Sequence, residues 1–152
     1  MILSGKEILA RKIFAPSYER TQDPISGMSY GLSYAGYDVR LAQDIELEPM
    51  GFELGSTIEH FNMPNDCFGF VTDKSSLIRQ GVCVGRGTIE PNWRGHLTLE
   101  ISNLTHTPRS LKAGTPIAQI VVQTILNPYS EGYDGKYQDQ ENEPVFFRRG
   151  SP

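Results

Sequence analysis

The sequence has few of the residues on which metal and nucleophile chemistry depends. Its histidines, His60, His96 and His106, lie far apart, and no H-x-E or C-x-x-C pattern occurs, which excludes the zinc-deaminase signature. No G-x-S-x-G elbow and no G-x-x-x-x-G-K-[ST] phosphate loop is present either. The two cysteines, Cys67 and Cys83, lack metal-ligand spacing. We expect them to be reduced structural thiols rather than a disulfide or a metal site.

Basic residues and long apolar runs are also scarce. The 152 residues include 14 Lys and Arg against 18 Asp and Glu, giving a net charge of -4. This balance argues against sequence-independent nucleic-acid binding but permits a small anionic ligand held by a few cations. No apolar run approaches a membrane span, and the first residues, MILSGKEILARKIF, lack the apolar segment of a signal peptide. We therefore expect a cytoplasmic protein that binds neither nucleic acid nor membranes.

Helical periodicity is largely confined to the start of the chain. Ser4 and Glu7 form a capping-box pair before Ile8, Leu9 and Ile13, which follow at helical spacing. This pattern predicts a short N-terminal helix.

Most of the remaining chain consists of short β-type runs separated by Gly, Pro, Asn and Asp. The runs are YDVRLAQDIEL, STIEHFNM, CFGFVTD, VCVG, HLTLEISN and PIAQIVVQTIL. A short helical insertion, KSSLIRQG, interrupts them, and GVCVGRGTIEP is expected to form a hairpin. The pattern predicts a mainly β protein, an antiparallel sandwich, jelly roll or barrel, with a single domain over residues 1–152.

A carboxylate stands at the centre of the polar face of the strand expected over 96–103. Leu97, Leu99 and Ile101 point to one side, and the other side has four polar residues, His96, Thr98, Glu100 and Ser102. Solvent alone would explain such a polar face. It is the commoner explanation when this strand is taken alone, and a binding pocket is the alternative.

The insertion at 74–81 combines cations with hydroxyl groups. Within about one helical turn it has four candidate anion ligands, Lys74, Ser75, Ser76 and Arg79. A helix start with such side chains can form a polyphosphate cradle. A solvated turn with basic residues would have the same composition, so both interpretations stay open at this point.

Five motifs together are much more specific than any one of them. They are SYAGYDVRLA, DKSSLIRQG, TIEPNWRGHLTLEISN, AGTPIAQI and GKYQDQ. In order and spacing they resemble the dCTP deaminase family, relatives of the trimeric dUTPases. The resemblance implies a distorted antiparallel β-barrel or jelly roll of the dUTPase-like type, assembled as a homotrimer with active sites between subunits. It also implies zinc-independent hydrolysis of dCTP to dUTP and ammonia, which supplies pyrimidine deoxynucleotide synthesis. A dUTP diphosphatase, or a bifunctional deaminase and diphosphatase, is the alternative.

The resemblance also implies roles for individual residues. Glu100 corresponds to the carboxylate that accepts a proton from water and passes it to the leaving group. Ser75 and Arg79 correspond to residues that orient the water and the tetrahedral centre at C4 of the base. Lys74 and Ser76 correspond to phosphate ligands.

Further matches concern the sugar and the tail. Glu90 matches a residue that contacts the deoxyribose 3′-hydroxyl; dUTPases usually have Asp there, so the longer side chain favours the deaminase. Gln119, in the I-A-Q motif, is expected to reach the nucleotide. Tyr129, Lys136 and Gln140 match tail residues that close over sugar and triphosphate, which makes 127–152 a flexible lid.

The same resemblance bears on how a metal ion is bound and on how activity is regulated. Mg²⁺ is expected to be bound through the substrate triphosphate and not directly by protein ligands. Inhibition by dTTP is a family property that the sequence leaves open, because the tip at 85–88, GRGT, departs from the usual family sequences. Arg86 has no obvious role in the family pattern, and the ending EPVFFRRGSP is unassigned. For Phe146 and Phe147 two interpretations stay open, packing on a neighbouring subunit or no role at all.

Overall fold

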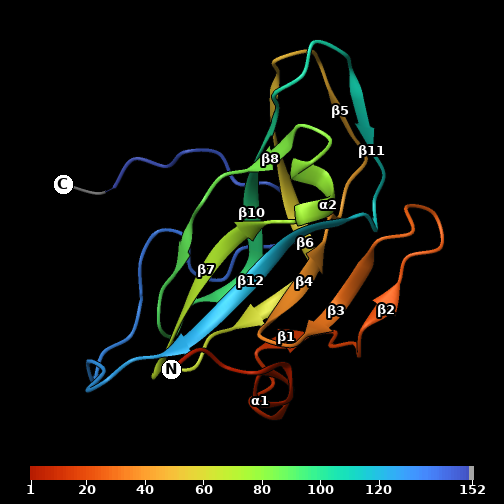
Figure 1. Ribbon diagram of the computed structural model, residues 1–152. Coiled ribbons are helices and arrows are strands. Elements are labelled where there is room, and N and C mark those ends of the chain that lie inside the picture. Colours follow the sequence, from red (N-terminus) through yellow and green to blue (C-terminus); the bar gives the residue numbers. More distant parts are fainter. Residues whose placement is uncertain (151–152) are drawn as a thin grey trace.

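Two antiparallel sheets face each other, and a two-stranded ribbon extends from one end (Figure 1). The structure is a computed structural model that describes residues 1–150. One sheet has the order β1 (Phe14–Ala15), β6 (Phe52–Asn62), β10 (Arg94–Asn103), β8 (Val82–Val84). The other has the order β2 (Thr21–Gln22), β3 (Ser29–Ser33), β4 (Gly36–Arg40), β12 (Pro116–Thr124), β7 (Cys67–Asp73), β9 (Thr88–Ile89). The ribbon pairs β11 (Arg109–Leu111) with β5 (Ile45–Leu47). The prediction of a mainly β, barrel-like fold is confirmed.

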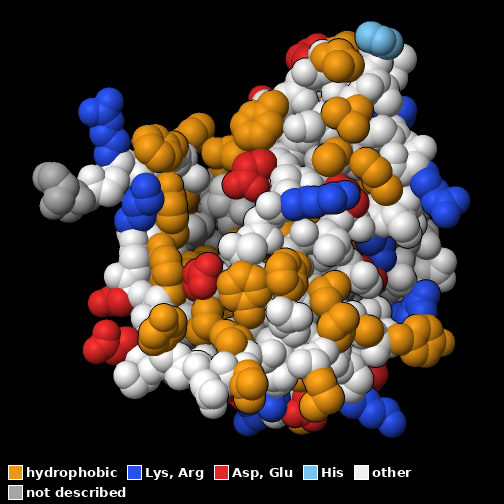
Figure 2. All heavy atoms as spheres, turned by 60° about the vertical axis from the view of Figure 1, so that its left-hand side comes forward, with side chains coloured by type: hydrophobic (Ala, Val, Ile, Leu, Met, Phe, Trp, Pro, Cys, Tyr) orange, Lys and Arg blue, Asp and Glu red, His pale blue; other side chains and the backbone are white. Residues whose placement is uncertain are grey.

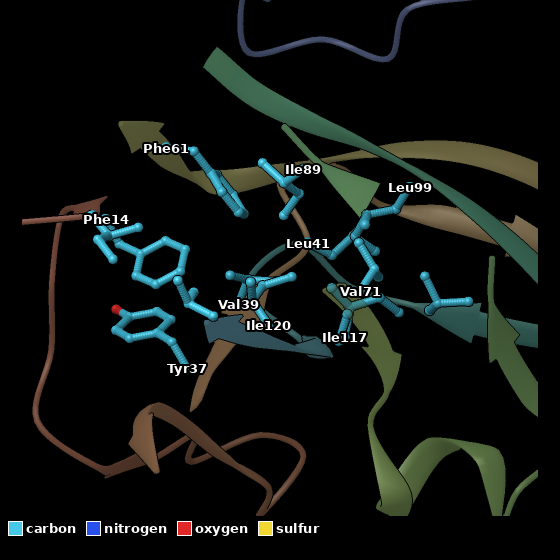
Figure 3. Close-up of a cluster of buried hydrophobic side chains, with 14 of the residues drawn as sticks. Phe14, Tyr37, Val39, Leu41, Phe61, Val71, Ile89, Leu99, Ile117 and Ile120 are labelled. Atoms are coloured by element: carbon cyan, nitrogen blue, oxygen red, sulfur yellow. The ribbon is translucent and has the colours of Figure 1, made fainter. Parts of the chain in front are cut away.

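The core lies between the two sheets, as Figure 3 shows. At one end, the Phe14 ring stacks on Tyr37 at 4.4 Å between centroids and meets Phe61 edge-on at 4.9 Å. At the other end, aliphatic side chains from β4, β7, β10 and β12 interdigitate. Burial of this apolar surface is the main force that holds the sheets together.

The N-terminal helix is confirmed but is shorter than its periodicity predicts. Helix α1 spans Gly5–Ala10, and the Ser4 hydroxyl caps it by accepting a hydrogen bond of 3.3 Å from the Glu7 N–H. Lys12 has a φ of 53°, which turns the chain out of the helix before Ile13. Ile13 is therefore buried as part of the next segment and not of the helix. No helix within residues 1–150 has both the length and the apolarity needed to cross a membrane.

The insertion at 74–81 forms a second helix, α2 (Ser75–Ile78), as expected, but the hairpin predicted after it is wrong. β8 pairs with β10, where Val84 lies opposite Ile101, whereas β9 pairs with β7, where Ile89 lies opposite Gly69. Residues 85–87 thus connect the two sheets. Both β8 and β9 have buried apolar residues. Each strand buries them by joining a different sheet, so the two strands do not pair with each other.

An irregularity in the pairing of β6 with β10 turns a charged side chain inward. Three residues of β6, 57–59, lie opposite Leu97 alone. The Thr57 hydroxyl accepts a hydrogen bond from the Leu97 N–H (3.0 Å) and donates one to the Glu59 carbonyl (2.7 Å). The Glu59 side chain is fully buried. Such irregularities commonly redirect a side chain next to a functional site.

Candidate active site

The predicted site residues lie around two cavities and not around one. The first, here called the carboxylate cavity, has a volume of about 610 Å³, and its lining includes Glu90, Glu100 and Gln140. The second, here called the cradle cavity, has a volume of about 440 Å³, and its lining includes Lys74, Ser75, Ser76 and Gln119. Three predicted residues line neither cavity: Arg79, Tyr129 and Lys136.

Strand β10 places Glu100 at the carboxylate cavity. Leu99 and Ile101 are buried in the core, while the Glu100 side chain is exposed on the opposite face, as the alternation predicts. The Gly85 N–H donates a hydrogen bond of 2.7 Å to the Glu100 carbonyl. A Cβ atom at Gly85 would lie 3.0 Å from Glu100 Oε2, so glycine allows the 85–87 connection to pass directly beside the carboxylate.

The other walls of the carboxylate cavity are mostly apolar, with aromatic and aliphatic side chains. The aliphatic ones are Leu54, Val71, Ile89, Leu97 and Val145, and the aromatic ones are Phe52, Trp93, Tyr133, Tyr137, Phe146 and Phe147. Figure 2 shows a hollow next to the C-terminal segment, with hydrophobic side chains along it and acidic side chains at its rim. Apolar walls with a few fixed polar groups are typical of sites for flat, polar-edged ligands.

The C-terminal tail forms one wall of this cavity by following β10 of its own chain. The Trp93 indole N–H donates to the Tyr137 carbonyl at 2.7 Å. Gly95 forms a parallel bridge with Gln140, and the next residue, His96, donates its N–H to the Gln140 carbonyl at 2.9 Å. The lid predicted over 127–152 therefore lies against the barrel in its described part, and its flexibility stays a prediction.

Two of the predicted tail residues, Tyr129 and Lys136, do not line either cavity. The Tyr129 side chain is 89% exposed. The Lys136 ammonium group donates to the Arg148 carbonyl and lies 4.8 Å from the centre of the Phe147 ring. Their contacts to a nucleotide stay predictions.

A buried ion pair forms the floor of the cradle cavity. Lys74 Nζ lies 2.7 Å from Asp38 Oδ2, and these residues are 8% and 6% exposed. Burial raises the pKa of Asp38, and the Lys74 charge opposes this effect. Gln119 lies opposite Asp38 in the β4–β12 pairing, and Arg20 also lines the cavity. Asp38 compensates the Lys74 charge and Asp73 also lines the cavity, so Arg20 and the hydroxyl groups of the two serines of α2 are the groups available to an anion.

Sequence reasoning missed a second ion pair, which involves the strand that carries Asp38. The Arg40 guanidinium lies between the rings of Tyr18 and Tyr30, 4.6 and 4.5 Å from their centres, and binds Glu59 at 2.9 Å. Burial raises the pKa of Glu59, while its hydrogen bonds to Arg40 oppose the increase. Arg40 belongs to β4, the strand of Asp38. No local signal could have paired Arg40 with Glu59, because they are 19 residues apart.

Both cysteines are free thiols, as expected, with Cys67 buried and Cys83 partly buried. Burial raises the pKa of Cys67 to about 11, which makes this thiol unreactive near neutral pH. In the part of the chain that the structure describes, no three His, Cys, Asp or Glu side chains are grouped so that they could hold a metal ion.

The fold is shared with solved dUTPase structures. One of them is a point mutant of the dUTPase from phage phi11 of S. aureus, described with a structural Mg(II) ion. It matches with a TM-score of 0.58 at 17% sequence identity, covering 79% of this chain and 92% of that one. At this identity the likeness shows the fold of the barrel only.

The sequence comparisons are more specific. The family model described as dCTP deaminase-like matches residues 18–125. A dCTP deaminase of Campylobacter fetus is 32% identical over 146 residues, covering 75% of this chain and 78% of the relative. A dCTP deaminase of Dichelobacter nodosus is 31% identical over 159 residues, covering 84% and 85%. The chain belongs to the dCTP deaminase-like family.

Proposed function

We propose that the protein is a hydrolase that converts dCTP and water to dUTP and ammonia. The observation that carries the proposal is the position of Glu100, a carboxylate on strand β10 at a cavity with aromatic and aliphatic walls, in a chain whose relatives include dCTP deaminases. Such a cavity suits a pyrimidine ring, and the carboxylate supplies the base that the hydrolysis requires.

The proposed reaction has one proton relay. Glu100 accepts a proton from a water molecule as the water oxygen attacks C4 of the cytosine ring, and passes it to ring N3, which gives a neutral tetrahedral centre with a hydroxyl and an amino group on C4. Glu100 then carries the hydroxyl proton to the amino nitrogen; the C4–N bond breaks to release ammonia, and the C4=O bond of dUTP forms. Ser75 and Arg79 orient the water and stabilise the charge that develops at the ring. The adjacent 85–87 backbone reads the edge of the base.

These groups would have to come from different chains. In one chain, Ser75 lines the cradle cavity and Glu100 lines the carboxylate cavity. A homotrimer with sites between subunits would bring the cradle cavity of one chain to the carboxylate cavity of another. The exposure of both Ser75 and Arg79 supports this arrangement, because each is free to contact a neighbouring chain.

The lining of the two cavities also suggests which residues would bind the triphosphate and the sugar. Lys74, Ser76 and Gln119 would bind the triphosphate, together with Arg20, which sequence reasoning did not include. Mg²⁺ would enter with the substrate, bound to the phosphates. Glu90, on the carboxylate cavity, would contact the sugar hydroxyl. A cytoplasmic location and inhibition by dTTP stay predictions.

The decisive experiment is an assay with dCTP and dUTP supplied separately, measuring ammonia and pyrophosphate. The proposal expects ammonia from dCTP and no pyrophosphate from either nucleotide. Pyrophosphate from dUTP without ammonia from dCTP would establish a dUTP diphosphatase instead, and both products would establish a bifunctional enzyme.

The metal requirement is tested separately. EDTA should lower the rate of ammonia release and added Mg²⁺ should restore it. Full activity in EDTA would contradict the proposal that Mg²⁺ is required.

A further inference from the structure

One hydroxyl group on the catalytic strand binds the tail at two points. Thr98 precedes Glu100 by two residues on β10, and both side chains line the carboxylate cavity. Thr98 Oγ1 donates a hydrogen bond of 2.9 Å to Gln140 Oε1 and accepts one of 3.0 Å from the Val145 N–H. The two ends of segment 140–145 therefore meet at a single oxygen atom.

The residues after this segment form an exposed apolar surface over the cavity. Phe146 and Phe147 line the carboxylate cavity, yet their side chains are 76% and 80% exposed. The chain then turns back, because the Arg148 N–H donates to the Tyr137 hydroxyl at 3.2 Å. Two large aromatic side chains left in water beside a cavity with aromatic and aliphatic walls indicate a surface that a bound ligand would cover.

We propose that Thr98 is a positioning residue that latches the tail over the carboxylate cavity, so that Phe146 and Phe147 form the roof of the base pocket. The identity of the base rests on the proposed function, whereas the latch does not. Stacking of a pyrimidine against the aromatic roof would then favour ligand binding.

The contacts of Thr98 distinguish a latch from a structural threonine. Both of its side-chain hydrogen bonds within residues 1–150 go to tail atoms and none goes to the barrel. The backbone of Thr98 pairs with Ser56 of β6 independently of the hydroxyl group. Replacing the hydroxyl by a methyl group should therefore release the tail and leave the barrel folded.

Trp93 provides a direct signal for tail closure. It is the single tryptophan of the sequence, it is 5% exposed, and its indole N–H binds the tail carbonyl of Tyr137 at 2.7 Å. Opening of the tail would expose the indole to water and move its fluorescence emission to longer wavelength. This signal is independent of turnover.

The test compares Thr98→Val with wild type in the absence of nucleotide. We expect red-shifted Trp93 emission and faster proteolysis of the tail, approaching the values of a chain truncated after Asn127. With dCTP, kcat/KM should fall about tenfold, because two hydrogen bonds that close the site are lost. Thr98→Ser, which keeps the hydroxyl, should have the emission, proteolysis rate and kcat/KM of wild type. Thr107→Val makes the same chemical change in an exposed loop and should leave all three measurements at their wild-type values.

Specific outcomes would refute the latch and the roof independently. Wild-type emission and proteolysis in folded Thr98→Val protein would refute the latch, whether or not dCTP is a substrate. An unchanged KM for dCTP in a Phe146→Ala, Phe147→Ala double variant would refute the roof, and a raised KM would support it. If wild type released no ammonia from dCTP, the proposed function would fail, while emission and proteolysis would still decide the latch.

Discussion

Glu59 binds Arg40 through both carboxylate oxygens. Oε1 lies 2.9 Å from the guanidinium Nε, and Oε2 accepts a hydrogen bond of 2.8 Å from the Arg40 backbone N–H. The contact joins β6 of one sheet to β4 of the other, inside the barrel. The pair therefore links the two sheets, through the strand β4 that also carries Asp38 of the cradle cavity.

Removing one partner of this pair should destabilise the fold. In a Glu59→Gln protein, the Arg40 guanidinium would stay buried without a compensating charge, which costs about 3 kcal/mol in comparable cases. We expect that loss in the free energy of unfolding, measured by urea denaturation. Glu53→Gln, an exposed position on the same strand, is the matched control and should change stability by less than about 0.5 kcal/mol. Equal effects of both substitutions would contradict the interpretation.

Glu100 should affect activity rather than folding. Its side chain is exposed and no core contact depends on its charge, so Glu100→Gln should have the thermal stability and oligomeric state of wild type. We expect ammonia release from dCTP to fall at least about a hundredfold, because the amide cannot accept the proton of water. Glu53→Gln again serves as the control. A Glu100→Gln protein that deaminates dCTP at the wild-type rate would exclude the proton relay.

Mixing two inactive variants should restore activity if sites form between chains. Ser75→Ala inactivates the cradle side and Glu100→Gln inactivates the carboxylate side. In oligomers assembled from equal amounts of both, about a quarter of the sites would combine two intact sides. We expect co-expressed variants to show ammonia release near that fraction of wild type. Mixed oligomers as inactive as either parent would show that both groups act within one chain.

Protonation of His60 should destabilise the fold as the solution becomes acidic. Its ring meets that of His96 at 5.3 Å, and burial followed by the His96 charge lowers the pKa of His60 below 6.5, with Arg94 acting in the same direction and Asp139 opposing. The unfolded chain therefore binds this proton at higher pH than the folded protein does, and protonation favours unfolding as the pH drops below 6.5.

We expect the Tm of wild type to fall relative to that of a His60→Gln variant when the pH is lowered from about 7.5 to about 5.5; the raised pKa values of Asp38 and Glu59 act in the opposite direction in both proteins. His106→Gln, which changes an exposed loop histidine, should keep the wild-type change in Tm. A His60→Gln protein whose Tm changed with pH as that of wild type does would exclude the contribution of His60.

Features that depend on neighbouring residues were determined by the sequence itself. The alternation in HLTLEISN correctly separated buried Leu99 and Ile101 from exposed Glu100. The Ser4 cap and the helical insertion at 74–81 were also predicted correctly. Each is a local effect, since strand faces alternate with a period of two residues and a cap acts within one helical turn.

The distribution of the site residues was decided only by the tertiary structure. Periodicity indicates that a residue leaves the core, but strand pairing decides what it meets. The sequence therefore did not show that β8 and β9 join different sheets, or that Glu100 and Ser75 line separate cavities. Nor did it show that Glu59 turns inward to Arg40. These arrangements depend on contacts between distant segments, which are selected by the burial of the whole barrel and not by local sequence.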